Sequence, residues 1–180
     1  MDQKHIFYLF LCMTSISFSQ TKQWKIDTED SYILYKGEHV LHSWEGINKN
    51  VNGVAIPNAA ANAIEKLAIL VYVRDFDSNN SGRDAHALEV LEALKYPEIR
   101  FYSEQIIIKE DQLQLKGSFD FHGIKIEKTL LADLKRKSST WEISGNFQLT
   151  HTDFKIKLPS FLSIKMKNIL DIEYSMVLTQ

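Results

Sequence analysis

Apolar and polar side chains alternate along much of the chain, most regularly in its second half. The clearest alternation covers residues 113–121, 124–135, 141–149 and 170–178. A period of two places successive side chains on opposite faces of an extended chain, so each segment is predicted to be a strand with one buried and one wet face. The predicted inward sets are Leu113, Leu115, Phe119 and Phe121; Trp141, Ile143, Phe147 and Leu149; and Leu170, Ile172, Tyr174 and Met176.

The first half of the chain carries weaker strand signals. Tyr, Ile, Val and Phe are frequent there, as is typical of strands. The predicted strands cover residues 24–27, 31–38, 46–55, 67–74 and 99–108. His122 and Gly123 separate two strands of the second half, which indicates a two-residue hairpin turn with positive φ at the glycine. The polar stretches 75–80 and 135–140 predict loops.

One segment, residues 82–95, is predicted to be a helix. Ser81 and Asp84 have the spacing of a capping box, in which the serine caps the first amides and the acid faces the positive helix end. Apolar residues then recur at intervals of three and four: Ala87, Leu88, Leu91 and Leu94. Pro97 ends the helix because the residue before a proline avoids the α region. A second apolar stretch, residues 159–164, predicts a single turn.

Eight or nine strands and one short helix predict an all-β fold. Strands with one apolar face bury it in a two-sheet sandwich or in a closed barrel, and periodicity alone does not choose between them. No Gly/Ser-rich linker, internal repeat or low-complexity tract interrupts residues 21–180. They are therefore predicted to form one domain.

The first twenty residues read as a secretory signal. Lys4 precedes a short apolar run, and small and polar residues follow it up to Gln20. This order is typical of an export signal, and the run is too short to cross a bilayer. The alternatives are a buried N-terminal helix and a lipid anchor at Cys12, but the run has no amphipathic spacing and Cys12 follows Phe-Leu rather than small residues. We expect an exported protein, periplasmic or extracellular.

Charge and cysteine content exclude several classes of function. Residues 21–180 contain 22 acidic and 20 basic residues, a balance that predicts no attraction to nucleic acid. No stable membrane insertion is expected either. The only cysteine, Cys12, lies in the predicted signal. The processed protein would therefore have no disulfide, thiol nucleophile or thiolate metal site.

Four segments, in order, resemble the YceI-like family. Residues 81–103 read SGRDAHALEVLEALKYPEIRFYS, which resembles the family's Arg-Asp-x-His cluster followed by Tyr-Pro-x-Ile-x-Phe-x-Ser. The other three read YILYKGEHVLHSWEG, LKGSFDFHGIKIEKTL and THTDFKIKLPSF, and the resemblance covers about residues 24–178. It implies a lipocalin-like antiparallel β-barrel of about eight strands that holds a polyisoprenoid lipid, such as a quinone, in its interior.

Catalytic and metal sites are not expected. The histidines outside the predicted signal show no H-x-x-x-H or H-E-x-x-H spacing, and His39 and His42 are predicted to point to opposite faces of a strand end. No G-x-S-x-G elbow and no glycine-rich phosphate loop occurs. The protein is therefore predicted not to be an enzyme and to need no cofactor.

The candidate ligand contacts are five aromatic residues and one polar cluster. The aromatic candidates are Phe119, Phe121, Trp141, Phe147 and Tyr174. They would form the core of any β fold and are also candidates to touch a ligand. Arg83 and His86 either belong to a capped helix start or hold a polar or phosphorylated headgroup at the barrel mouth.

Two functions remain open on this basis. The first is an exported carrier that holds an apolar lipid, because a prenyl chain gains about 0.8 kcal/mol for each methylene removed from water. The second is an exported interaction or stress-response module whose barrel is filled by its own side chains.

Overall fold

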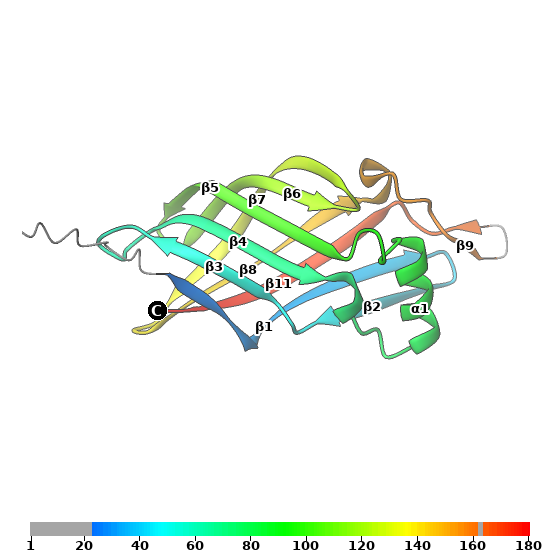
Figure 1. The fold of residues 1–180 in the computed structure, drawn as a ribbon, viewed down its shortest axis with the longest axis horizontal. Helices are drawn as coiled ribbons and strands as arrows, with labels where there is room; N and C mark the ends of the chain where they lie inside the picture. Colours follow the sequence, from blue (N-terminus) through cyan, green and yellow to red (C-terminus); the bar gives the residue numbers. More distant parts are fainter. Residues whose placement is uncertain (1–22, 162–163) are drawn as a thin grey trace, which may run out of the picture.

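The alternating segments form one antiparallel sheet in the computed structural model, which describes residues 23–161 and 164–180 (Figure 1). Its strands are β1 (Trp24–His39), β2 (His42–Asn48), β3 (Asn52–Pro57), β4 (Ile64–Tyr72), β5 (Glu98–Lys109), β6 (Gln112–Phe121), β7 (Ile124–Arg136), β8 (Thr140–Thr150) and β11 (Ile169–Thr179). The other elements are the 3₁₀-helices η1 (Val73–Asp75) and η2 (His151–Phe154), the α-helix α1 (Ser81–Val90), and the short strands β9 (Ser160–Phe161) and β10 (Ile164–Lys165).

Eight of these strands close into a barrel. Neighbouring strands follow the order β1, β3, β4, β5, β6, β7, β8 and β11, and β11 pairs back onto β1. This last pairing has an irregularity between Asp27 and Tyr32 on β1. β2 pairs with the second half of β1, outside the closed ring. Because β1 and β11 join the two ends of the sheet, the fold is a barrel, and the sandwich alternative is wrong.

The predicted inward faces are confirmed. All members of the three sets are buried except Phe147 and Leu170, which are partly buried. On β6 each buried residue alternates with an exposed or partly exposed one. Because a slip of one residue would turn every apolar side chain of a strand to the solvent, burial of these faces fixes the register.

The hairpin turn between β6 and β7 is also confirmed. Phe121 pairs directly with Ile124, which leaves His122 and Gly123 as a two-residue loop. Both have positive φ, 52° and 72°, as the type I′ turn requires.

The predicted helix is too long, and its predicted cap is wrong. α1 ends at Val90, and Glu92 has a φ of 45°, outside the helical region. The N-cap is Asn80 rather than Ser81: its backbone is extended, and its side-chain oxygen accepts a hydrogen bond from the Arg83 amide at 2.9 Å. The Asp84 carboxylate does not complete a capping box, because it accepts instead from the hydroxyl of Ser78 at 2.6 Å.

The single turn predicted over residues 159–164 is wrong as well. Ile164 and Lys165 pair antiparallel with Phe161 and Ser160, so these four residues form a short two-stranded ladder. The Met166 amide extends the pairing by donating to the Pro159 carbonyl at 3.1 Å. Leu158 precedes Pro159 and is therefore biased towards extended backbone, so the chain enters this stretch extended rather than helical.

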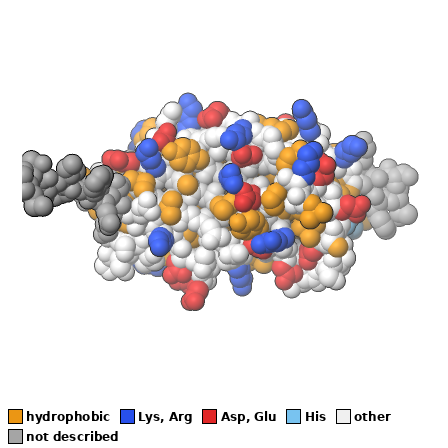
Figure 2. All heavy atoms as spheres, viewed as in Figure 1, with side chains coloured by type: hydrophobic (Ala, Val, Ile, Leu, Met, Phe, Trp, Pro, Cys, Tyr) orange, Lys and Arg blue, Asp and Glu red, His pale blue; other side chains and the backbone are white. Residues whose placement is uncertain are grey.

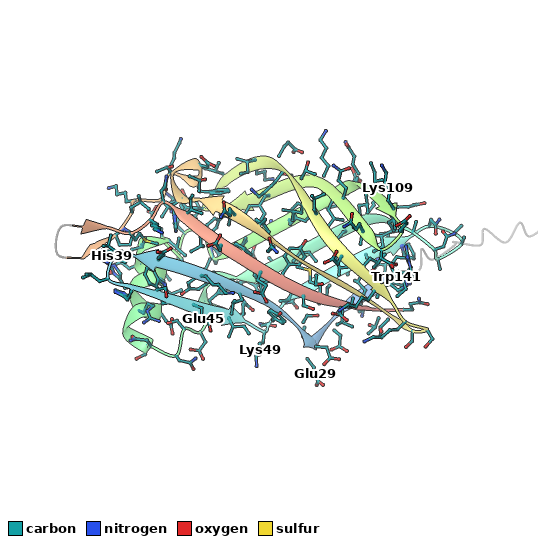
Figure 3. All side chains as sticks on the ribbon, turned by 180° about the vertical axis from the view of Figure 1, so that it is seen from behind. Glu29, His39, Glu45, Lys49, Lys109 and Trp141 are labelled. Atoms are coloured by element: carbon teal, nitrogen blue, oxygen red, sulfur yellow. The ribbon has the colours of Figure 1, made fainter. Side chains whose placement is uncertain are left out.

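The barrel has two different ends. Figure 1 shows α1, the tip of the β1–β2 hairpin and β9 at one end, and the C-terminus at the other. We call the first the helix end. Figure 3 shows Trp141 and Lys109 towards the opposite end from His39. We call the end that contains Trp141 the closed end, because its interior is filled by side chains.

Candidate functional site

At the closed end, two tryptophans fill the interior. Trp24 and Trp141 meet edge to face with ring centroids 4.7 Å apart, an arrangement that aromatic pairs favour. Trp24 is fully buried, as is Leu178. The guanidinium of Arg136 lies 5.1 Å from the Trp141 ring centroid. Trp141 therefore helps to close the barrel.

The middle of the barrel contains a cavity of about 80 Å³. Its lining comes from β1, β4, β5, β6, β7, β8 and β11 and from the segment after η1. On β8 it extends from Ile143 to Leu149, which is about 20 Å along a strand. Of its seventeen lining residues, only Arg100 and Tyr174 carry polar side-chain groups. The space is long, narrow and apolar.

Three of the predicted aromatic contacts meet at this cavity. Phe119, Phe147 and Tyr174 line it, on β6, β8 and β11. Their rings form a connected group, with centroids 5.9 Å apart between Phe119 and Phe147 and 6.1 Å apart between Phe147 and Tyr174. Phe121 and Trp141 also point inward but do not line the cavity. Side chains with the same inward direction therefore lie at different heights along the barrel.

The Tyr174 hydroxyl is a hydrogen-bond donor in this apolar interior. Burial, and to a smaller extent the Asp133 charge, raises the pKa of Tyr174 to about 12. The phenol therefore stays protonated at neutral pH, and its hydroxyl lies 3.4 Å from the Leu131 carbonyl of β7. It is suited to donating a hydrogen bond rather than to acid–base chemistry.

Besides Phe101 of β5, which also lines the cavity, two aromatic residues near it were not predicted as site residues. Phe76 lines it, although it lies in a segment predicted to be a polar loop. Phe154 of η2 is fully buried and packs against Phe119 and Phe121, with centroids 5.8 and 5.2 Å away. The sequence signal in both cases is a single phenylalanine beside an aspartate in a short polar stretch.

Arg83 and His86 lie on α1, away from the cavity lining. The Arg83 guanidinium lies 5.9 Å from the Trp44 ring centroid, and its Nη1 donates to the Ser78 carbonyl at 3.4 Å. The exposed His86 has its Nδ1 3.8 Å from a carboxylate oxygen of Glu89. These contacts account for both residues as parts of the helix start, and their role in holding a headgroup stays a prediction.

Tyr35 connects the helix end to the barrel wall. Its ring lies over Gly46 of β2, where an added Cβ would be 2.4 Å from the ring, and its centroid is 5.6 Å from that of Phe76. Burial, and then the Asp84 charge, raises the pKa of Tyr35. The aromatic lining thus continues from the cavity towards α1.

The histidine pair at the β1–β2 tip differs from its prediction. His39 and His42 pair directly across a two-residue hairpin, and their ring centroids are 5.6 Å apart. The prediction of opposite faces was wrong because the strand turns between them. Across residues 23–161 and 164–180, no group of three or more His, Cys, Asp or Glu has the geometry to hold a metal ion.

The surface carries charges of both signs. Figure 2 shows basic and acidic side chains interspersed over the face in view. Within the described part of the chain, no helix has the length and apolar character needed to span a membrane.

Comparison with known proteins decides the family. A family model described as the YceI-like domain matches residues 24–178. The chain belongs to the YceI-like domain family. The resemblance seen in the sequence is thereby confirmed. Protein YceI of Escherichia coli O157:H7 is 26% identical over 166 residues, which cover 83% of this chain and 86% of that protein. Protein YceI of Salmonella newport (strain SL254) is 26% identical over 145 residues, 77% of this chain and 75% of the relative.

Solved structures share the YceI-like fold. BcnA of Burkholderia cenocepacia matches with a TM-score of 0.75 at 15% identity, over 84% of this chain and 98% of that one. A polyisoprenoid binding domain from Saccharophagus degradans, implicated in plant cell wall breakdown, matches with a TM-score of 0.71 at 8% identity, over 87% and 97%. At these identities the similarity establishes a common fold.

Proposed function

We propose that this protein is an exported carrier that holds an apolar lipid of the polyisoprenoid class in its barrel. The observation that carries the proposal is the apolar cavity along β8, which is lined by residues from seven strands of a closed barrel. Such a space binds by shape and apolar area, with few polar contacts. The Saccharophagus degradans neighbour, described as polyisoprenoid binding, supports the same ligand class.

Export is part of the proposal and rests on the sequence. The charged start, apolar run and small-residue exit of residues 1–20 support a signal peptide. These residues lie outside those the structure describes. N-terminal sequencing of the secreted protein should begin beside Ser19 or Gln20, and a mature chain beginning at Met1 would contradict export through this signal.

The size of the cavity bears on how a ligand would be held. Pockets for drug-sized ligands measure about 300–1,000 Å³, several times the volume found here. A long lipid therefore requires side chains at the cavity to move. Of the five aromatic residues that line it, Phe76 and Phe147 are only partly buried and have the most freedom to do so. No residue of the protein needs to perform redox or acid–base chemistry in this role.

The same small volume favours a second candidate, a ligand-free exported module with a filled barrel. Native mass spectrometry of the purified protein, followed by organic extraction, distinguishes the two. A carrier is expected to show one lipid adduct per chain that extraction removes. Protein that carries no adduct and takes up no added prenyl lipid after delipidation would overturn the carrier and support the filled module.

A further inference from the structure

The barrel wall is incomplete between β7 and β8. Only four residue pairs join these strands, from Asp133 with Ser144 to Arg136 with Trp141. By contrast, ten pairs join β6 to β7 and eleven join β8 to β11. The remainder of β7, residues 124–132, and of β8, residues 145–150, is not paired across this gap. We call these two stretches the side seam.

Side chains replace part of the missing ladder at the side seam. The Lys128 ammonium of β7 donates to the Gln148 carbonyl of β8 at 2.8 Å. The Tyr174 hydroxyl passes beside Gly145, where an added Cβ would lie 2.7 Å from it, and approaches the Leu131 carbonyl of β7. These single contacts are easier to exchange than a backbone ladder, because a side chain can rotate away without moving the strand.

Lys128 is unusual in its position. It lies on the same face of β7 as Ile126 and Leu130, the face that points into the barrel. It is a charged residue among side chains that are otherwise apolar on this face. Its chain leaves the interior through the side seam, and its ammonium lies 5.5 Å from the Phe147 ring centroid. An apolar residue would pack equally well at this position, so packing does not explain the charge of Lys128.

Lys128 also differs from its neighbours in its electrostatic partners. Lys125 of the same strand lies 3.7 Å from the Asp120 carboxylate, and Lys135 lies 3.3 Å from that of Glu142. Among the described residues, no carboxylate forms an ion pair with Lys128, and its ammonium contacts one carbonyl and one aromatic face. An ammonium has three donors, so the one hydrogen bond to the Gln148 carbonyl uses only part of its capacity for charge-assisted bonds.

Phe147 separates the cavity from this ammonium. Its ring lines the cavity and is partly buried. It also borders an outer depression lined by Lys36, Asn146, Gln148, Ile172 and the carboxylates Asp171 and Glu173, so the same residue faces both the interior and the surface. The Phe147 ring therefore contacts both the apolar cavity and the Lys128 ammonium.

We propose that the side seam is a headgroup site, in which Lys128 binds the anionic end of a lipid whose apolar chain occupies the cavity. The proposal rests on the proposed carrier function and narrows its ligand class to chains that end in a carboxylate or a phosphate. On binding, Lys128 exchanges the Gln148 carbonyl for the anion, and charge-assisted hydrogen bonds make this exchange favourable. The rival position for an anionic head is Arg83, at the helix end.

Three probes with one chain length test the headgroup site. Dodecanoate, dodecyl phosphate and dodecanol are titrated at pH 8 into the delipidated full chain, by displacement of a fluorescent apolar probe. Two variants change the proposed site: Lys128→Met keeps length but not charge, and Lys128→Arg keeps charge. Lys125→Met is the matched control on the same strand, and Arg83→Ala tests the rival position at the helix end.

The wild type should bind the two anions more tightly than dodecanol. Lys128→Met should weaken the anions about tenfold, the effect of losing one hydrogen bond to a charged group, and leave dodecanol unchanged. Lys128→Arg should keep the preference for anions, and Lys125→Met should behave as wild type. Whichever of dodecanoate and dodecyl phosphate loses more affinity in Lys128→Met identifies the headgroup, carboxylate or phosphate, that the site prefers.

Each contrary outcome has a distinct meaning. Equal wild-type affinity for all three probes, or an equal loss for all three in Lys128→Met, would overturn the headgroup site while leaving the carrier intact. Loss of anion preference in Arg83→Ala but not in Lys128→Met would place the head at the helix end and overturn it as well. Failure of every probe to bind would overturn the carrier and the headgroup site together.

Discussion

At the closed end of the barrel, Trp24 and Trp141 meet edge to face and the surrounding aliphatic side chains are almost fully buried. At the helix end, the cover is α1, in which no residue is fully buried, and η2, which inserts Phe154. The cavity lies between these two covers and its lining includes neither tryptophan. One end is therefore built to hold the fold together, and the rest of the interior has room to adapt.

The largest expected effect comes from the closed end. Trp141→Ala should lower the free energy of unfolding by about 3–5 kcal/mol, because it removes a large buried ring without a neighbour free to fill the space. Guanidinium-induced unfolding measures this directly. A loss below about 1.5 kcal/mol would show that the closed end is not the stabilising region.

Phe147→Ala tests the other side of the comparison. We expect a smaller loss of unfolding free energy in delipidated protein, about 1–3 kcal/mol, because the ring is partly exposed and already borders a cavity. Lipid retention during purification should fall at the same time. A loss as large as that of Trp141→Ala, in a protein from which no lipid can be extracted, would indicate a filled barrel.

Asn80→Ala tests how α1 is held over the helix end. Loss of the cap to the Arg83 amide should lower the free energy of unfolding by about 1 kcal/mol. Ser81→Ala is the matched control, because Asn80 and not Ser81 caps the helix. Thermal unfolding of both variants checks this assignment, which a larger effect in Ser81→Ala would contradict.

The smallest expected effect is a pH dependence from His151. Burial lowers the pKa of His151 below its usual value, and its Nδ1 lies 3.1 Å from the Asn168 carbonyl. The unfolded chain therefore takes up the proton first as pH falls, so stability present above about pH 6.5 should decline as pH falls towards the folded-state pKa. Subtracting the curve for His151→Gln should isolate this decline, and parallel curves for the two proteins would contradict it.

Alternation along the sequence predicted the strands and their inward faces because burial of one face is a local property with a period of two. It did not predict height along the barrel. Phe119 and Phe121 have the same parity, yet only Phe119 lines the cavity. Height depends on stagger between strands, which is set by pairings between distant segments.

The side seam was hidden for the same reason. β7 and β8 both read as full strands, and nothing local shows that only four pairs join them. Lys128 was the available signal, as a charged residue at an inward position. The apolar residues around Lys128 are sufficient to predict the strand, so this one charged residue does not reveal the missing pairs.

As a carrier, the protein is expected to hold an apolar chain in the middle of the barrel, away from the closed end. A prenyl chain carrying a photoactivatable diazirine can be loaded into the delipidated protein, irradiated, and its attachment sites mapped by peptide mass spectrometry. Labelling is predicted on peptides that contain Phe119, Phe147 and Tyr174, with little on Trp24. Labels confined to exposed apolar residues such as Val40 and Leu131 would show that the chain binds outside and would contradict this expectation.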